Sequence, residues 1–88
     1  MINQMDIHQF IRERSYLIWY TQNYDGLDAP AILEATLNYG DWDDVQKLIA
    51  ILGVQESARI FREYSRRSRS NYRREISNYF ELYFNKYA

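Results

Sequence analysis

The strongest structural signal in this sequence is the spacing of aromatic and apolar side chains near its C-terminal end. From Tyr72 onward they recur every three or four residues, at Ile76, Tyr79, Phe80, Tyr83, Phe84 and Tyr87. At 3.6 residues per turn, this spacing gathers them on one side of an α-helix. We therefore predict a helix over about 71–87 whose aromatic side faces a core.

Four earlier segments show the same kind of periodicity, and we predict helices over about 6–20, 28–40, 41–53 and 54–65. Asp6, Asp28 and Asp41 are suited to accept free backbone N–H groups as N-caps. Gly40 and Gly53 are expected to end two of the helices, with Gly40 in the left-handed conformation. The turn at 23–26 suggests a positive φ at Asn23 or Gly26.

The third predicted helix is apolar around most of its circumference, which is typical of a central helix. Its inward stripe is expected to contain Trp42, Val45, Ile49 and Leu52, widened by Leu48. We therefore expect this helix to lie at the centre of the fold.

The composition supports an all-α protein. With 88 residues the chain has the size of one domain, and three Gly and one Pro are too few for the turns of an all-β fold. We predict an all-α, compact single-domain bundle of about five short helices covering residues 1–88. The chain has no Cys, no apolar run near the roughly 20 residues of a membrane span, and no signal-peptide pattern at its start, so we expect a cytoplasmic protein with no membrane contact.

Three aromatic residues of the first predicted helix point away from its apolar stripe: Tyr16, Trp19 and Tyr20. Tyr and Trp combine an apolar ring with a polar O–H or N–H group, and both are enriched at protein interfaces. The first predicted helix is therefore either buried on two sides or presents an aromatic patch at its end. In the second case these three are candidate interface residues, and self-association through the first or last helix is one use for them.

The residue types that usually perform catalysis are scarce. The single histidine, His8, has no neighbouring ligand and is expected at the surface. Asp41, Asp43 and Asp44 could form half of a divalent-metal site, but acids at a helix start are more simply explained by capping. No phosphate-binding loop or nucleophile motif is present. We predict no enzyme activity, catalytic residue, cofactor or bound metal.

Charge is unevenly distributed along the chain. Residues 1–58 hold nine acidic and three basic side chains, whereas 59–88 hold eight basic and three acidic ones. The basic residues concentrate in a segment that forms a candidate partner or anion contact, with Arg66, Arg67, Arg69, Asn71, Arg73 and Arg74. The segment could be a solvated loop paired with acids of the same molecule or of a neighbour, a contact for a protein partner, or a contact for nucleic acid.

The run 37–45 carries a Leu-x-Tyr-Gly-Asp-Trp motif, from Leu37 to Trp42, and Gly53 closes the next helix. This pattern resembles the signature of a group of small uncharacterised bacterial helical proteins, and the segments 69–73, 78–80 and 83–84 are similar to that group's closing part. The resemblance covers about 27–88. Its members are often encoded beside abortive-infection nucleotidyltransferase toxins, which implies an antitoxin-like or accessory role.

Together these features favour a non-catalytic protein–protein interaction module, antitoxin-like or accessory, whose partner could be a toxin-like nucleotidyltransferase. The alternative is a nucleic-acid-binding accessory protein that uses the 66–74 segment. A homo-oligomer is compatible with either function.

Overall fold

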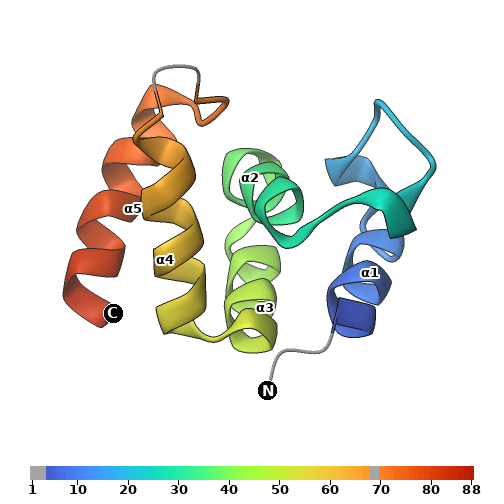
Figure 1. Cartoon of the computed structure of the whole chain (residues 1–88), viewed down its shortest axis with the longest axis horizontal. Coiled ribbons are helices and arrows are strands. Elements are labelled where there is room, and N and C mark those ends of the chain that lie inside the picture. Colours follow the sequence, from blue (N-terminus) through green and yellow to red (C-terminus); the bar gives the residue numbers. More distant parts are fainter. Residues whose placement is uncertain (1–3, 68–69) are drawn as a thin grey trace.

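Helices alone build the part of the chain that the computed structural model describes, residues 4–67 and 70–88, with side chains described from Ile7 onward (Figure 1). The elements in chain order are α1 (Gln4–Arg12), the 3-10 turns η1 (Ser15–Leu17) and η2 (Tyr24–Gly26), α2 (Ala29–Tyr39), α3 (Trp42–Leu52), α4 (Val54–Ser65) and α5 (Arg74–Tyr87). This confirms an all-α bundle. Its Cα radius of gyration is 12.1 Å.

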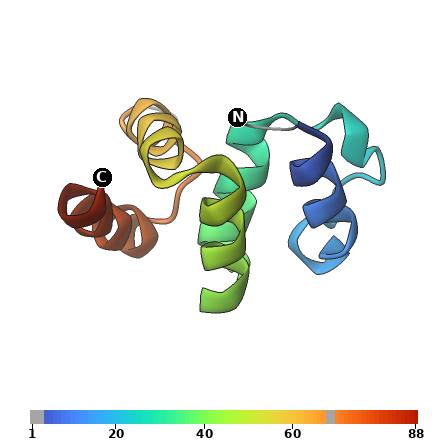
Figure 2. The ribbon, with the colours of Figure 1, turned by 90° about the horizontal axis from the view of Figure 1, so that it is seen from below.

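The two middle helices, α2 and α3, separate α1 on one side from α4 and α5 on the other (Figures 1 and 2). Helix α2 is more deeply buried than expected, because it contacts α1, α3 and α4. Its buried side chains are Ile32, Leu33, Ala35, Thr36, Leu37 and Asn38. Helix α3 likewise contacts α1, α2 and α4. The expectation that α3 lies at the centre of the fold is therefore confirmed, and α2 shares that position.

Two of the predicted N-caps are confirmed. The Asp28 side chain accepts a hydrogen bond from the Ala31 N–H (3.0 Å), and the Asp41 side chain accepts one from the Asp44 N–H (2.8 Å). The first helix begins at Gln4, before the predicted cap Asp6, whose side chain lies outside the described residues.

Glycine has a different role at each helix end. Gly40 ends α2 with an extended backbone, so the predicted left-handed conformation was wrong. Glycine is required there because a Cβ would lie 2.7 Å from the Thr36 carbonyl oxygen. Among the described residues, positive φ occurs only at Gly53 (φ 87°), so the expectation for Asn23 or Gly26 was also wrong.

The first and last helices are shorter than the periodicity predicts. Helix α1 ends at Arg12 rather than near residue 20, because Arg14 leaves the helical region (φ −128°, ψ 49°). Helix α5 begins at Arg74 rather than Asn71, after Arg73 in an extended conformation. In both places a long-range polar contact, described below, holds the chain out of the helix.

No helix within residues 4–67 and 70–88 combines the length and the apolar character that crossing a membrane demands.

Candidate protein-interaction surface

Three aromatic rings form an exposed cluster beside the C-terminal end of α2. Trp19 is 67% exposed, and its ring lies edge-on to Tyr39 (5.0 Å between centroids) and to Tyr20 (6.1 Å). The chain reaches this position because Leu17 and Ile18, immediately before, are buried and fix the segment to the core. We call Trp19, Tyr20 and Tyr39 the Trp19 patch. Its first two members were predicted, whereas Tyr39 was not.

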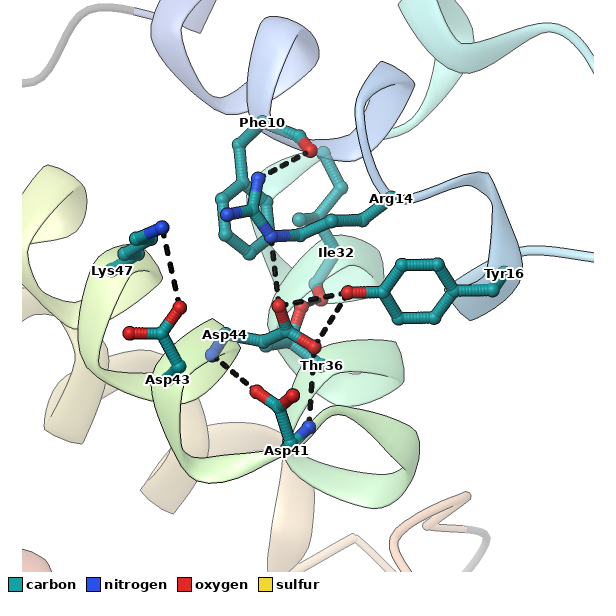
Figure 3. Close-up of polar contacts among 9 residues, drawn as sticks. All are labelled: Phe10, Arg14, Tyr16, Ile32, Thr36, Asp41, Asp43, Asp44 and Lys47. Atoms are coloured by element: carbon teal, nitrogen blue, oxygen red, sulfur yellow. Dashed lines mark hydrogen bonds and ion pairs between the residues drawn. The ribbon is translucent and has the colours of Figure 1, made fainter.

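The third predicted aromatic, Tyr16, is held by a buried carboxylate (Figure 3). Its ring is exposed, but its hydroxyl donates to Asp44, with both carboxylate oxygens 2.8 Å away. The same carboxylate accepts a hydrogen bond from Arg14 Nε (2.9 Å). Tyr16 and Arg14 therefore bend toward Asp44, and this contact explains why the first helix stops early.

The Asp44 carboxylate is the main electrostatic feature beneath this surface. Burial raises its pKa, but hydrogen bonds from Tyr16, Arg14 and the Asp41 backbone outweigh burial, and the net pKa is lowered. The pKa of Tyr16 is raised, chiefly because its hydroxyl donates to Asp44. Sequence reasoning missed this role, because the partners of Asp44 lie about 30 positions earlier in the chain.

The acids at the start of α3 act as structural groups. Asp41 and Asp44 form a reciprocal capping box, and Asp43 pairs with Lys47 at 3.2 Å (Figure 3). Within the described part of the chain, no group of three or more His, Cys, Asp or Glu side chains is arranged to hold a metal ion.

Acidic side chains border the Trp19 patch. The pKa of Tyr20 is raised by partial burial and then by the nearby carboxylates of Glu34 and Asp28. Glu34 is half-buried, and its own pKa is raised by that burial. Two carboxylates therefore act electrostatically on Tyr20, one of the three exposed rings of the patch.

Two arginines before α5 form ion pairs with acids of α4 and α5. Arg66 pairs with Glu81 (3.1 Å) and Arg67 with Glu63 (3.8 Å), while Arg67 also lies 3.9 Å over the Tyr64 ring. Both partners, Glu63 and Glu81, belong to the basic half of the sequence. Arg69 lies outside the described residues.

The remaining members of the predicted contact segment sit at the start of α5. Arg73 pairs with Glu75 at 3.9 Å, and Arg74 is exposed and makes no ion pair among the described residues. The Asn38 amide donates to the Asn71 carbonyl (3.1 Å) and accepts from the Arg73 N–H (3.0 Å). This clamp from α2 holds 71–73 outside the helix, and sequence reasoning did not identify Asn38.

Trp42, Tyr79 and Tyr87 were expected to face the core, but they are exposed. Trp42 lies edge-on to Tyr79 (6.4 Å) and to Tyr83 (5.6 Å), and is 44% exposed. This occurs because α5 packs mainly against α4, so only a narrow strip of its aromatic side is covered. These rings form a second exposed aromatic group on the molecule.

His8 was expected at the surface, but it is half-buried. Its Nε2 lies 2.8 Å from the Leu27 carbonyl oxygen, joining α1 to the segment after η2. This contact gives His8 a structural role.

Comparison of the chain with protein-family models, curated proteins and solved structures finds no match.

Proposed function

We propose that this chain is a non-catalytic protein–protein interaction module that binds its partner through the Trp19 patch. The observation that carries the proposal is the exposure of Trp19 next to two tyrosine rings. Trp and Tyr dominate the binding energy of protein interfaces, because each buries a large area and loses little side-chain entropy.

The surroundings of the patch support a partner with a basic rim. Glu34 and Asp28 lie close enough to Tyr20 to raise its pKa, and residues 1–58, which contain the patch, carry nine of the twelve acidic side chains of the chain. A partner with an apolar pocket surrounded by Lys or Arg would complement both features.

The finer proposal is an antitoxin-like or accessory role in the cytoplasm, with a toxin-like nucleotidyltransferase as partner. Its support is the resemblance of the segment from Leu37 to Trp42 to bacterial proteins encoded beside such toxins. Tyr39 belongs to both that motif and the Trp19 patch, which links the two lines of argument.

A pull-down from the native lysate of the source organism, with and without nuclease, tests the proposal. We expect the tagged chain to capture a specific protein that survives nuclease. Trp19→Ala should reduce this capture at least tenfold, because Trp hot spots contribute about 2 kcal/mol or more. Trp42→Ala is the matched control, since it removes the other exposed tryptophan and should leave capture unchanged.

Two results would contradict the proposal. Equal capture by the Trp19→Ala variant would remove the patch from the interface. Capture of nucleic acid alone, weakening steeply with salt, would instead favour the 66–74 segment as a phosphate contact. The ion pairs of Arg66 with Glu81 and of Arg67 with Glu63 would compete with phosphate for these guanidinium groups, whereas Arg74 makes no ion pair among the described residues.

A further inference from the structure

The solvent-facing side of α5 carries four exposed residues in one row: Glu75, Tyr79, Leu82 and Lys86. Their spacing of four, three and four residues places them above one another on a single helix face. The opposite side of α5 holds Phe80 and Phe84, which pack against Phe61 of α4. We call the four exposed residues the outer row.

The middle of the outer row is strongly apolar. Leu82 is 72% exposed, the highest value among the large hydrophobic side chains of the described residues, and Tyr79 is 53% exposed. A shallow hollow of about 200 Å³ lies between Tyr79, Leu82, Tyr83 and Lys86. Trp42 contacts Tyr79 and Tyr83 along one edge of this area. A contiguous apolar area of this kind is typical of an interaction site.

The order of charges along the outer row indicates which partner covers it. The row runs acid, aromatic, aliphatic, base, and its midpoint lies between Tyr79 and Leu82. When a second α5 lies antiparallel across it, Glu75 faces Lys86 of the second copy, and Tyr79 faces Leu82 of the second copy. A parallel arrangement would place like charges together at both ends. The row is therefore complementary to itself in the antiparallel direction only.

We propose that the outer row is a homodimer interface in which two α5 helices pack antiparallel about a two-fold axis. Leu82 of each copy enters the hollow beside Tyr79 of the other, and two Glu75–Lys86 ion pairs flank this apolar centre. The proposal goes beyond the interaction with a different protein, because it requires only a second copy of this chain.

The dimensions of the interface predict a weak dimer. A helix of the 14 residues of α5 is about 21 Å long, so the contact area falls at the low end for protein interfaces. We therefore expect dissociation in the micromolar range. In the monomer Glu75 pairs with Arg73 at 3.9 Å between two exposed side chains, and such a contact is readily exchanged for the pair across the interface.

Sedimentation equilibrium of the full chain over a wide concentration range is the first test. We expect a reversible monomer–dimer equilibrium that Leu82→Glu shifts at least tenfold toward monomer. Ala50→Glu is the matched control, because it adds the same charge at an exposed site that lies beside α1, away from α5. A wild-type chain that stays monomeric at every concentration would overturn the proposal.

Charge exchange gives a second test that does not depend on the Leu82 variant folding. Glu75→Lys and Lys86→Glu should each weaken the dimer severalfold, and the double variant should restore it, because both ion pairs re-form with reversed polarity. Glu13→Lys makes the same charge change on an exposed residue just after α1 and should have no effect. Additive weakening in the double variant would contradict the pairing.

Cross-linking reports the direction of the helices, because the chain has no natural Cys. In the antiparallel dimer the two copies of residue 82 lie close to the two-fold axis, whereas the two copies of residue 75 are separated by about 16 Å along the helices. With a thiol oxidant added, we expect Leu82→Cys to form a disulfide-linked dimer and Glu75→Cys to form none. Equally rapid cross-linking at both positions would overturn the antiparallel arrangement.

Failure of this proposal is distinguishable from failure of the proposed function. Partner capture is lost through Trp19→Ala, whereas dimerisation is lost through Leu82→Glu. A Leu82→Glu chain that is monomeric and still captures the partner supports both proposals.

Discussion

The carboxylate of Asp44 joins three parts of the molecule. It accepts hydrogen bonds from the Asp41 N–H at the start of α3 (3.2 Å), from Arg14 beyond α1 and from Tyr16 in η1 (Figure 3). The charge is buried, and these donors replace the water that it loses. Its net lowered pKa shows that the donors stabilise the ionised form by more than burial destabilises it.

Asp44→Asn should therefore be strongly destabilising. It removes the charge facing the largely buried Arg14, and we expect the free energy of unfolding to fall by about 2–3 kcal/mol. Asp43→Asn is the matched control, because the Asp43–Lys47 pair is exposed and should contribute no more than about 0.5 kcal/mol. Urea unfolding at neutral pH, followed by circular dichroism, measures both values.

The same carboxylate predicts the acid dependence of stability. Its pKa in the folded chain lies below the ordinary value of 3.8, so the unfolded chain binds more protons between these two values. The stabilisation is fully present above the ordinary value and is lost as the pH falls through the lowered one. The wild-type chain should lose stability more steeply than Asp44→Asn in this window. If the free energy of unfolding falls in parallel with pH in the two chains, another acid dominates the acid dependence of stability.

Tyr72 has a buried hydroxyl with no hydrogen-bond partner among the described residues. Its pKa is raised, first by burial and then by the charge of Glu34. Tyr72→Phe keeps the ring contact with Phe61 (5.2 Å) and removes the unsatisfied group. We expect the variant to be as stable as the wild type, or up to about 1 kcal/mol more stable, by the same urea measurement. A variant that is less stable than the wild type would indicate a bound water that forms a hydrogen bond with the Tyr72 hydroxyl.

The helices themselves could be predicted from local sequence, but several of their ends could not. Asp28 and Asp41 cap α2 and α3 through neighbours three residues away, so a local pattern is sufficient to find them. The ends of α1 and α5 depend on Asp44 and Asn38, which act on partners 28 to 35 positions away. A side chain that holds a distant segment out of a helix leaves no trace in that segment's periodicity.

In the candidate surface, too, local sequence predicts some residues correctly and fails for others. Trp19 and Tyr20 were predicted as interface residues because they leave the apolar stripe of their segment. Trp42 and Tyr79 were assigned to the core because periodicity gives the direction of an apolar side but not the width that neighbours cover. The actual covered width of α5 depends on its single main neighbour, α4.

The junction between α3 and α4 depends on the backbone of Gly53. Its torsions (φ 87°, ψ 144°) are ones that residues with a Cβ rarely adopt, although nothing within 4 Å would contact that Cβ. Gly53→Ala should therefore lower the free energy of unfolding by about 1–3 kcal/mol through backbone strain alone. Differential scanning calorimetry should show a lower Tm, and circular dichroism should show an unchanged helix content.

Gly26→Ala is the control for this variant. Its φ is not positive, and the added Cβ would meet only the end of the Asn23 side chain, which can move. We expect a change within about 0.5 kcal/mol, as for ordinary surface substitutions. Equal losses at the two glycines would show that backbone torsion is not the cause.

The molecule as a whole is asymmetric in how its helices are supported. Helices α2 and α3 are covered by neighbours on both sides, whereas α5 depends mainly on α4 for its packing (Figure 2). Native-state hydrogen exchange should find that α5 amides open at a lower free energy than those of α2 and α3, because fewer buried contacts oppose opening. Measurements at low protein concentration keep self-association from masking the difference. Identical opening energies throughout would show a single cooperative unit.

Both tryptophans of the chain lie at the surface, one in the Trp19 patch and one beside α5. The fluorescence of the folded chain therefore comes from indole rings that are already in contact with water. Unfolding should change the emission only modestly, whereas covering either surface should shift it toward shorter wavelengths and shield the ring from a dissolved quencher. With one tryptophan replaced by Phe at a time, the chain becomes an optical reporter for each of its two exposed aromatic surfaces.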